Sequence, residues 1–229
     1  MTLNPSVADD QLGQYYRRTS AIADRLDKSL SFTDAMEALQ CLHDGKFRFE
    51  NGVLILDTPK PVAEPVKFAL LADLGIITVP DDYEHAKRLD TFMKRNRKKF
   101  YGVNDNITDA NFPNPSRVLK PGDKLQVRAF KQIVGGTTSS EERMAFLATQ
   151  KAVYTGAQGA SLVFEEKRNQ LPEGYWYVSF DEKDRLWFDG GDRRVPCIDR
   201  RSHGDFYWSL GYFENDWSGG SALLCFCDV

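Results

Sequence analysis

The C-terminal segment of residues 192–229 constrains this chain more than any other stretch. Its aromatic residues occur at spacings that fit short strands, and Gly, Ser, Asn, Asp and Arg separate them. Rigid aromatic and Arg side chains among small polar groups are typical of a binding surface rather than of a catalytic centre. We therefore expect the residues before this segment to build a scaffold that displays it.

Composition excludes several classes of protein. The net charge of -3 gives no overall attraction to nucleic acid or to an anionic membrane. No apolar run approaches the roughly 18–20 residues that span a bilayer, so we expect no membrane segment. The first residues lack the order of a signal peptide, which predicts a cytoplasmic protein unless other machinery exports it or assembles it into a particle.

The four cysteines predict reduced, buried thiols. Cys225 and Cys227 are two positions apart, so a strand would point both thiols to the same face. A zinc site would need a second cysteine pair or clustered histidines, and the three histidines are scattered along the chain. We therefore predict no disulfide framework and no metal site at the cysteines.

The first hundred residues predict an α-rich domain. Apolar spacing favours helices over residues 1–45, 66–74 and 81–100, with one or two short strands around the turn Asn51–Gly52 and another strand over residues 75–79. Residues 101–117 are rich in Asn, Asp, Pro and Gly and predict a linker before a second domain at 118–229.

The second domain predicts an α+β fold. Residues 125–134 alternate like a strand, Thr138 and Glu141 fit a capping box that begins a helix, and a second helix is expected over 160–170. Several short strands follow, the last over 223–227. We expect two helices flanking a small, irregular antiparallel sheet whose first and last strands pair.

Two charged clusters each have a functional and a structural interpretation. The basic residues between Lys94 and Lys99 suit nucleic acid, but they also suit the negative end of a helix dipole, which we favour. Five carboxylates surround two turns and suit calcium, although turn-forming, solubilising acids are the favoured interpretation. These carboxylates are Asp181, Glu182, Asp184, Asp189 and Asp192.

This order of elements, with the apolar final strand Leu223–Asp228, resembles the C-type-lectin fold. More narrowly, it resembles the variable proteins of diversity-generating retroelements, which carry their diversified residues at the C-terminal end of that fold. The resemblance implies that adenines of a template are mutagenised, so that AAY codons become NNY codons. Such codons cannot encode Lys, Gln, Met, Glu or Trp.

The distribution of these five residue types agrees with the resemblance. They account for 38 of the first 191 residues but for three of the last 38, namely Trp208, Glu214 and Trp217. The resemblance therefore implies a variable region at about 195–227.

Alternation along residues 205–210 divides candidate contact residues from scaffold residues, with Phe206, Trp208 and Leu210 on the core face. Tyrosines would bury a large area, and arginines would bind carboxylate or phosphate. The candidate variable residues are Asp199, Arg200, Arg201, His203, Asp205, Tyr207, Ser209, Tyr212, Asn215, Asp216, Ser218 and Ser221. The candidate scaffold residues are Phe206, Trp208, Phe213, Glu214 and Trp217.

For three of these residues a purely structural role is the alternative interpretation. His203 beside Gly204 also fits a loop, and Arg200 and Arg201 also fit a solvated turn.

The function expected from the resemblance is binding of diverse macromolecular ligands, mainly proteins, without a catalytic residue or a cofactor. The N-terminal region would tether the display domain to a partner or form a homo-oligomer. One alternative is a lectin-like domain of fixed specificity. Another is an enzyme of the formylglycine-generating type, although Cys225 and Cys227 lie in an apolar strand that favours burial over reactivity. A third is a nucleic-acid adaptor that uses Lys94 to Lys99, with nucleic acid as the less favoured partner.

Overall fold

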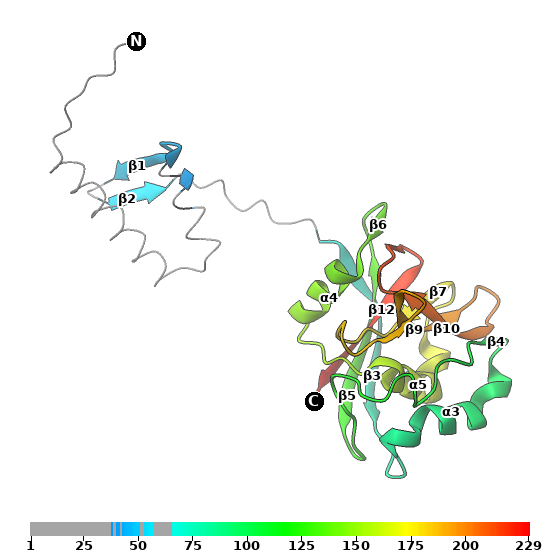
Figure 1. Ribbon diagram of the computed structural model, residues 1–229. Helices are drawn as coiled ribbons and strands as arrows, with labels where there is room; N and C mark the ends of the chain where they lie inside the picture. The colour runs from blue at the N-terminus through cyan, green and yellow to red at the C-terminus, as the bar shows by residue number, and fades with distance from the viewer. Residues whose placement is uncertain (1–37, 39, 42, 51–52, 57–65) are drawn as a thin grey trace. The chain divides into compact units, whose positions relative to one another are not determined.

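The computed structural model describes residues 38, 40–41, 43–50, 53–56 and 66–229 (Figure 1). The chain divides into two compact units, Met1–Glu64 and Pro65–Val229. No helix in the described part is long and apolar enough to cross a membrane.

The first unit contains the expected hairpin. Strand β1 (Phe47–Glu50) pairs antiparallel with β2 (Val53–Leu56), and Glu50 lies opposite Val53. The turn residues themselves, and most of the helices expected over 1–45, lie outside the described residues.

The second unit contains ten strands and three α-helices within residues 66–229, all of which the structure describes. The strands are β3 (Phe68–Thr78), β4 (Gly102–Val103), β5 (Lys124–Gln132), β6 (Thr137–Thr138), β7 (Tyr175–Val178), β8 (Trp187–Asp189), β9 (Asp192–Arg200), β10 (Phe206–Tyr212), β11 (Trp217–Ser218) and β12 (Ser221–Asp228). The helices are α3 (Arg88–Asn96), α4 (Ser140–Thr149) and α5 (Gly156–Lys167), with short 3-10 helices at His85–Lys87, Arg97–Lys99 and Arg168–Gln170.

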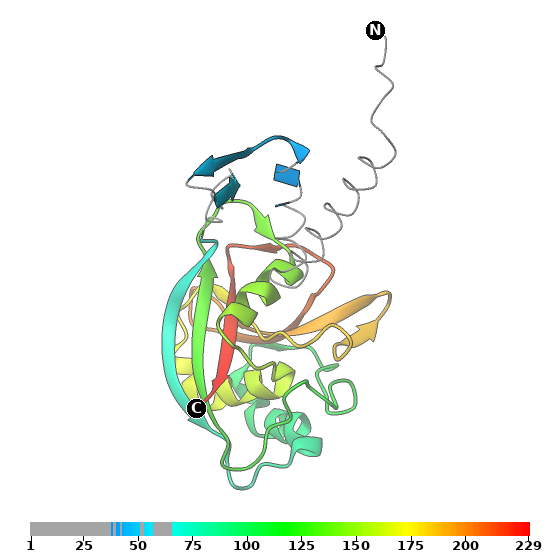
Figure 2. The same ribbon diagram turned by 90° about the vertical axis from the view of Figure 1, so that its left-hand side faces the viewer.

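The main sheet is larger and more mixed than the expected small antiparallel one. Seven strands lie in the order β3-β5-β12-β7-β9-β10-β4, and β8 pairs with β9 as the eighth. The pairs β12–β7 and β10–β4 are parallel, and the other pairs are antiparallel. Figure 2 shows β3, β5 and β12 side by side. The prediction that the first and last strands of 118–229 pair is confirmed, since β5 and β12 are antiparallel neighbours.

Helices cover both faces of this sheet. Alternate residues of β12 enter two different cores: Ala222 and Leu224 join the core that contains residues of α3 and α5, whereas Leu223 and Cys225 join the core that contains Leu147 of α4. Burial on both faces explains why β12 is an almost continuous apolar run.

The helix expected over 66–74 is part of one long strand. The register of β3 against β5 shifts between Leu70 and Ala72 and again between Asp73 and Gly75. Gly75 has a positive φ of 72°, and its N–H donates to the Asp73 carboxylate over 2.9 Å. These irregularities interrupt the two-residue alternation, so the apolar spacing of this strand imitates a helix.

Helix α3 begins at Arg88 rather than near Asp81, because its N-terminus is capped from elsewhere in the chain. The N–H groups of Leu89 and Asp90 donate to the Asp109 carboxylate over 2.9 and 3.1 Å. Asp109 lies in the segment 101–117 that was expected to be a linker between domains. That segment instead lies inside the second unit, together with β3 and α3.

The capping box of α4 is shifted by one residue from its expected position. The Ser139 hydroxyl accepts from the Glu142 N–H, and the Glu142 carboxylate accepts from the Ser139 N–H. The Thr138 hydroxyl is used differently: it donates to the Gln132 side chain and accepts from Arg143.

Candidate functional site

The register of the sheet aligns residues from five strands in one row. Opposite one another lie Ser221 of β12, Trp176 of β7, Asp199 of β9, Tyr207 of β10 and Gly102 of β4. Directly paired residues share a face of a sheet. Three segments of the chain that are distant in sequence therefore contribute to one surface.

The neighbouring row points to the opposite face and is buried. It contains Ala222, Tyr177, Ile198 and Trp208, all within the core shared with α3 and α5. Phe206 and Leu210 pack against the same core while remaining half-buried. The alternation along β10 thus separates an apolar face from the face that carries Tyr207.

Arg201 connects the exposed aromatic residues of the first row. Its Nε lies 2.6 Å from Oδ2 of Asp199, and its guanidinium lies 4.8 Å from the ring centroid of Tyr207 and 5.9 Å from that of Trp176. Both distances fall within the range of a cation–π contact. Burial raises the pKa of Asp199, and the Arg201 guanidinium opposes that shift.

A further tyrosine extends the row beyond Tyr207. The ring of Tyr101 lies 5.3 Å from that of Tyr207, and its side chain is 75% exposed. The Tyr207 ring passes over Gly102, where a Cβ would lie 2.7 Å from Cδ1. Tyr101 and Trp176 were not among the predicted contact residues, because both lie upstream of the C-terminal segment.

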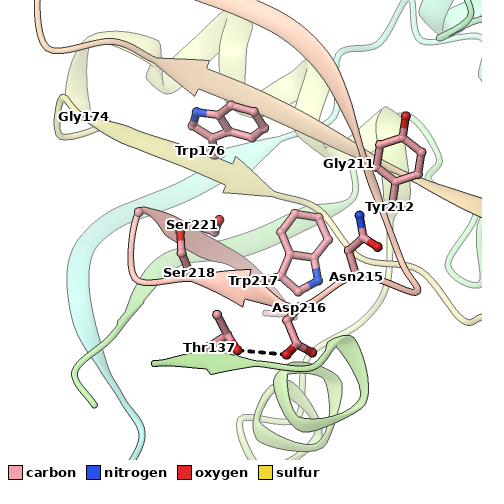
Figure 3. Close-up of a pocket in the computed structure, with 11 residues that line it drawn as sticks. Thr137, Gly174, Trp176, Gly211, Tyr212, Asn215, Asp216, Trp217, Ser218 and Ser221 are labelled. Atoms are coloured by element: carbon pink, nitrogen blue, oxygen red, sulfur yellow. Dashed lines mark hydrogen bonds between the residues drawn. The ribbon is translucent and has the colours of Figure 1, made fainter. Parts of the chain in front are cut away.

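Beside this row is a pocket of about 370 Å³ (Figure 3). Indole and phenol rings from three strands or their ends line it: Trp176, Trp217 and Tyr212. Polar residues and glycines complete the lining, and five of the predicted contact residues are among its members. The remaining lining residues are Thr137, Gly174, Gly211, Asn215, Asp216, Ser218, Gly220 and Ser221.

Trp217 is held tightly in this pocket. Its Nε1 donates to the Ser140 hydroxyl over 2.7 Å, and its ring lies 5.6 Å from that of Phe180 in an edge-to-face contact. A Cβ at position 211 would lie 2.3 Å from Cη2 of Trp217, so the indole needs a glycine there. These contacts hold the indole of Trp217 in place.

Arg143 of α4 fixes the backbone of the pocket from beneath. Its side chain is fully buried and makes five hydrogen bonds, three of them to the carbonyl groups of Trp217, Ser218 and Ser221. The other two acceptors are the side chains of Thr138 and Gln132. Burial lowers the pKa of Arg143 to about 10, so the guanidinium stays charged at neutral pH.

Several predicted contact residues are buried or are hydrogen-bonded to other parts of the chain. Asp199 and Ser221 are buried. Arg200 donates to the carbonyl groups of Arg168, Asn169 and Leu171 and to the Glu173 carboxylate. The Ser209 hydroxyl is buried and has no hydrogen-bond partner among the described residues.

The remaining predicted contact residues lie at or near the surface. His203 and Asp205 pair over 2.9 Å in the turn between β9 and β10. Asp216 accepts from the Thr137 hydroxyl over 2.9 Å. Of the expected scaffold residues, Phe213 lies in the core shared with α4, and Glu214 accepts from the Arg193 backbone and guanidinium.

The cysteines and the carboxylate cluster have local partners. Burial raises the pKa of Cys197 to about 12, and burial beside Cys227 also raises the pKa of Cys225. Asp181 accepts from Ser116 and Glu182, and Asp189 pairs with Arg194. Within the described ranges, no group of three His, Cys, Asp or Glu residues is positioned to hold a metal ion.

The basic cluster before Tyr101 is partly neutralised. Arg95 pairs with Asp82, Arg97 pairs with Asp105, and Lys99 donates to the Asn96 side chain.

Comparisons with protein-family models, with curated proteins and with solved structures found no significant match to this chain.

Proposed function

We propose that this chain is a ligand-binding protein, and that a retroelement diversifies its C-terminal surface through adenine-directed mutagenesis. One observation supports binding most directly. The side chains of Trp176, Arg201, Tyr207 and Tyr101 contact one another in a row, and this row adjoins a pocket lined by two tryptophans and a tyrosine. Trp, Tyr and Arg dominate the binding energy of protein interfaces. Here they lie together, and all of them except the buried Trp217 are at least partly exposed.

The proposed scaffold is C-type-lectin-like. It agrees with the order of one strand, two helices and several short strands in residues 118–229, and with the pairing of β5 and β12. The additional strand β3 and helix α3 are elaborations of that scaffold in this proposal.

Diversification restricts which predicted residues vary. A residue that is free to change must not hold the fold together, which removes Asp199, Arg200 and Ser221 from the variable set. The remaining exposed or half-exposed candidates are Arg201, His203, Asp205, Tyr207, Ser209, Tyr212, Asn215, Asp216 and Ser218. All nine belong to types that NNY codons encode.

The first test is to sequence the locus that encodes the protein. We expect a near-copy of the codons for about 195–227, differing at adenines, beside a reverse transcriptase gene. The differences should include the nine exposed or half-exposed candidates and omit Asp199, Arg200 and Ser221. Absence of both the copy and the reverse transcriptase would refute diversification and leave a binding domain of fixed specificity.

A further inference from the structure

We infer that the pocket between Trp176, Trp217 and Tyr212 receives an uncharged aromatic side chain of a peptide or protein partner. The inference rests on the proposed binding function, but it does not depend on diversification. Its first support is that a guanidinium already lies over each of the three rings. Arg201 is 5.9 Å from the centroid of Trp176, Arg143 is 5.8 Å from that of Trp217, and Arg194 is 4.1 Å from that of Tyr212.

This arrangement disfavours a cationic ligand. An aromatic cage attracts a cation through the negative potential of the ring faces, and here each ring already has a cation within about 6 Å of its centroid. A second cation would meet like charge. The ring faces are therefore less favourable to a lysine or arginine side chain of a partner than those of an unoccupied aromatic cage.

An anionic ligand is disfavoured by the balance of charges. Asp199 pairs with Arg201 and Asp189 pairs with Arg194, which leaves Arg143 and the lining residue Asp216 as opposite charges. Asp216 presents its carboxylate at the pocket, where its hydrogen-bond partner is the neutral Thr137 hydroxyl. The three guanidinium groups are thus matched by three carboxylates, and an anion would lie beside the Asp216 carboxylate, which has no ion-pair partner within the described residues.

A neutral aromatic side chain fits both the walls and the rim. Offset or edge-to-face packing against Trp176 and Tyr212 would bury its ring. At the rim, the side-chain amide of Asn215 and the hydroxyl of Ser218 make no hydrogen bond within the described part of the chain. Both are therefore available to the backbone of a peptide. The pocket volume of about 370 Å³ lies at the lower end of the roughly 300–1,000 Å³ typical of ligand sites.

The test uses the full chain and a phage-displayed library of random peptides. We expect the selected peptides to share a Trp, Tyr or Phe and to lack Lys and Arg at the same position. A selected peptide, labelled with fluorescein, is then titrated by fluorescence anisotropy. Replacing its shared aromatic residue by Lys should weaken binding at least about tenfold.

Two variants of the protein locate the peptide. Trp176→Ala removes one wall of the pocket, and Ser218→Trp fills it. Each variant should weaken binding about tenfold or more. Phe188→Ala is the matched control, because Phe188 is also exposed and also has a guanidinium over its ring, that of Arg193, but lies outside the pocket. It should change the affinity by less than about twofold. Near-ultraviolet circular dichroism confirms that each variant is folded.

Three results would overturn the inference: a library that yields no binder, peptides that tolerate Lys in place of the aromatic residue, or full affinity for Trp176→Ala and Ser218→Trp. Binding of an oligothymidine or a neutral oligosaccharide that Ser218→Trp abolishes, without peptide binding, would assign the pocket to that ligand instead. A failed search for a template copy at the locus leaves these results unaffected, so the two proposals fail separately.

Discussion

The indole of Trp217 lies so close to Gly211 that a Cβ at position 211 would meet Cη2 at 2.3 Å. This contact joins β10 to β11 and sets the floor of the pocket. No side chain other than hydrogen fits there without displacing the indole, which Ser140 and Phe180 hold in place.

Gly211→Ala should therefore destabilise the protein by about 1–3 kcal/mol through overpacking. Urea unfolding followed by tryptophan fluorescence measures the free energy of unfolding. Gly219→Ala is the control, because nothing lies within 4 Å of its Cβ position, and it should have little effect. Equal stabilities of the two variants would contradict the packing described here.

Arg143→Met should cost about 3 kcal/mol or more in the free energy of unfolding. The substitution leaves the carbonyl groups of Trp217 and Ser221 buried, and that of Ser218 part-buried, without their donor, and each buried unsatisfied group costs about 1–3 kcal/mol. The same peptide titration should show weaker binding, because these carbonyls belong to the pocket. Arg185→Met, at an exposed arginine, serves as the control and should be nearly neutral.

Asp181 makes stability depend on pH in the direction opposite to that of most carboxylates. Burial raises its pKa to about 6 from an ordinary value of 3.8, against the hydrogen bonds from Ser116 and Glu182. The folded state therefore binds the proton more tightly than the unfolded state, and the carboxyl contributes most to stability below pH 4. That contribution, about 3 kcal/mol, is lost as the pH rises from about 4 to 6.

Asp181→Asn keeps an oxygen acceptor but cannot ionise, so it should lack this loss. Chemical unfolding of both proteins between pH 4 and 7 measures the difference between their slopes. Parallel stability curves would show that Asp181 is not the group responsible.

Asp109→Ala should destabilise the protein by about 1 kcal/mol, the typical effect of losing a helix N-cap, because Leu89 and Asp90 lose their acceptor. Thermal unfolding of the full chain measures the change. Asp105→Ala removes only an exposed ion pair with Arg97 and should have a smaller effect. The opposite order would argue against capping of α3 by the segment 101–117.

Local patterns predicted the elements whose signals are local. The alternation around Val127 and Ala129 identified β5, and the apolar run around Leu224 identified β12. Local sequence also predicted the capping box, but one residue too early. Thr138 and Ser139 each have a glutamate three residues later, and it is Ser139 that caps the helix. Burial of Trp208 followed from the two-residue period of β10.

Distant relationships were not predictable in this way. The pairing of β7 with β12 and with β9 depends on where the chain returns, and these pairings bring Trp176 beside the C-terminal segment. Asp109 caps a helix that begins 21 residues earlier, which the composition of its own loop does not reveal. Trp176 lies between two tyrosines, so alternation of large aromatic residues could not indicate which of the three faces solvent.

The position of β12 has a consequence for how the protein folds. This strand enters between β5 and β7, both of which precede it in the chain. Until it arrives, the sheet exists as two halves, β3-β5 and β7-β9-β10-β4, each with an open edge. Because such edges invite pairing with other chains, the stage before β12 inserts is the one most exposed to aggregation. The strand that completes both cores is thus also the one that covers the inner edges of β5 and β7.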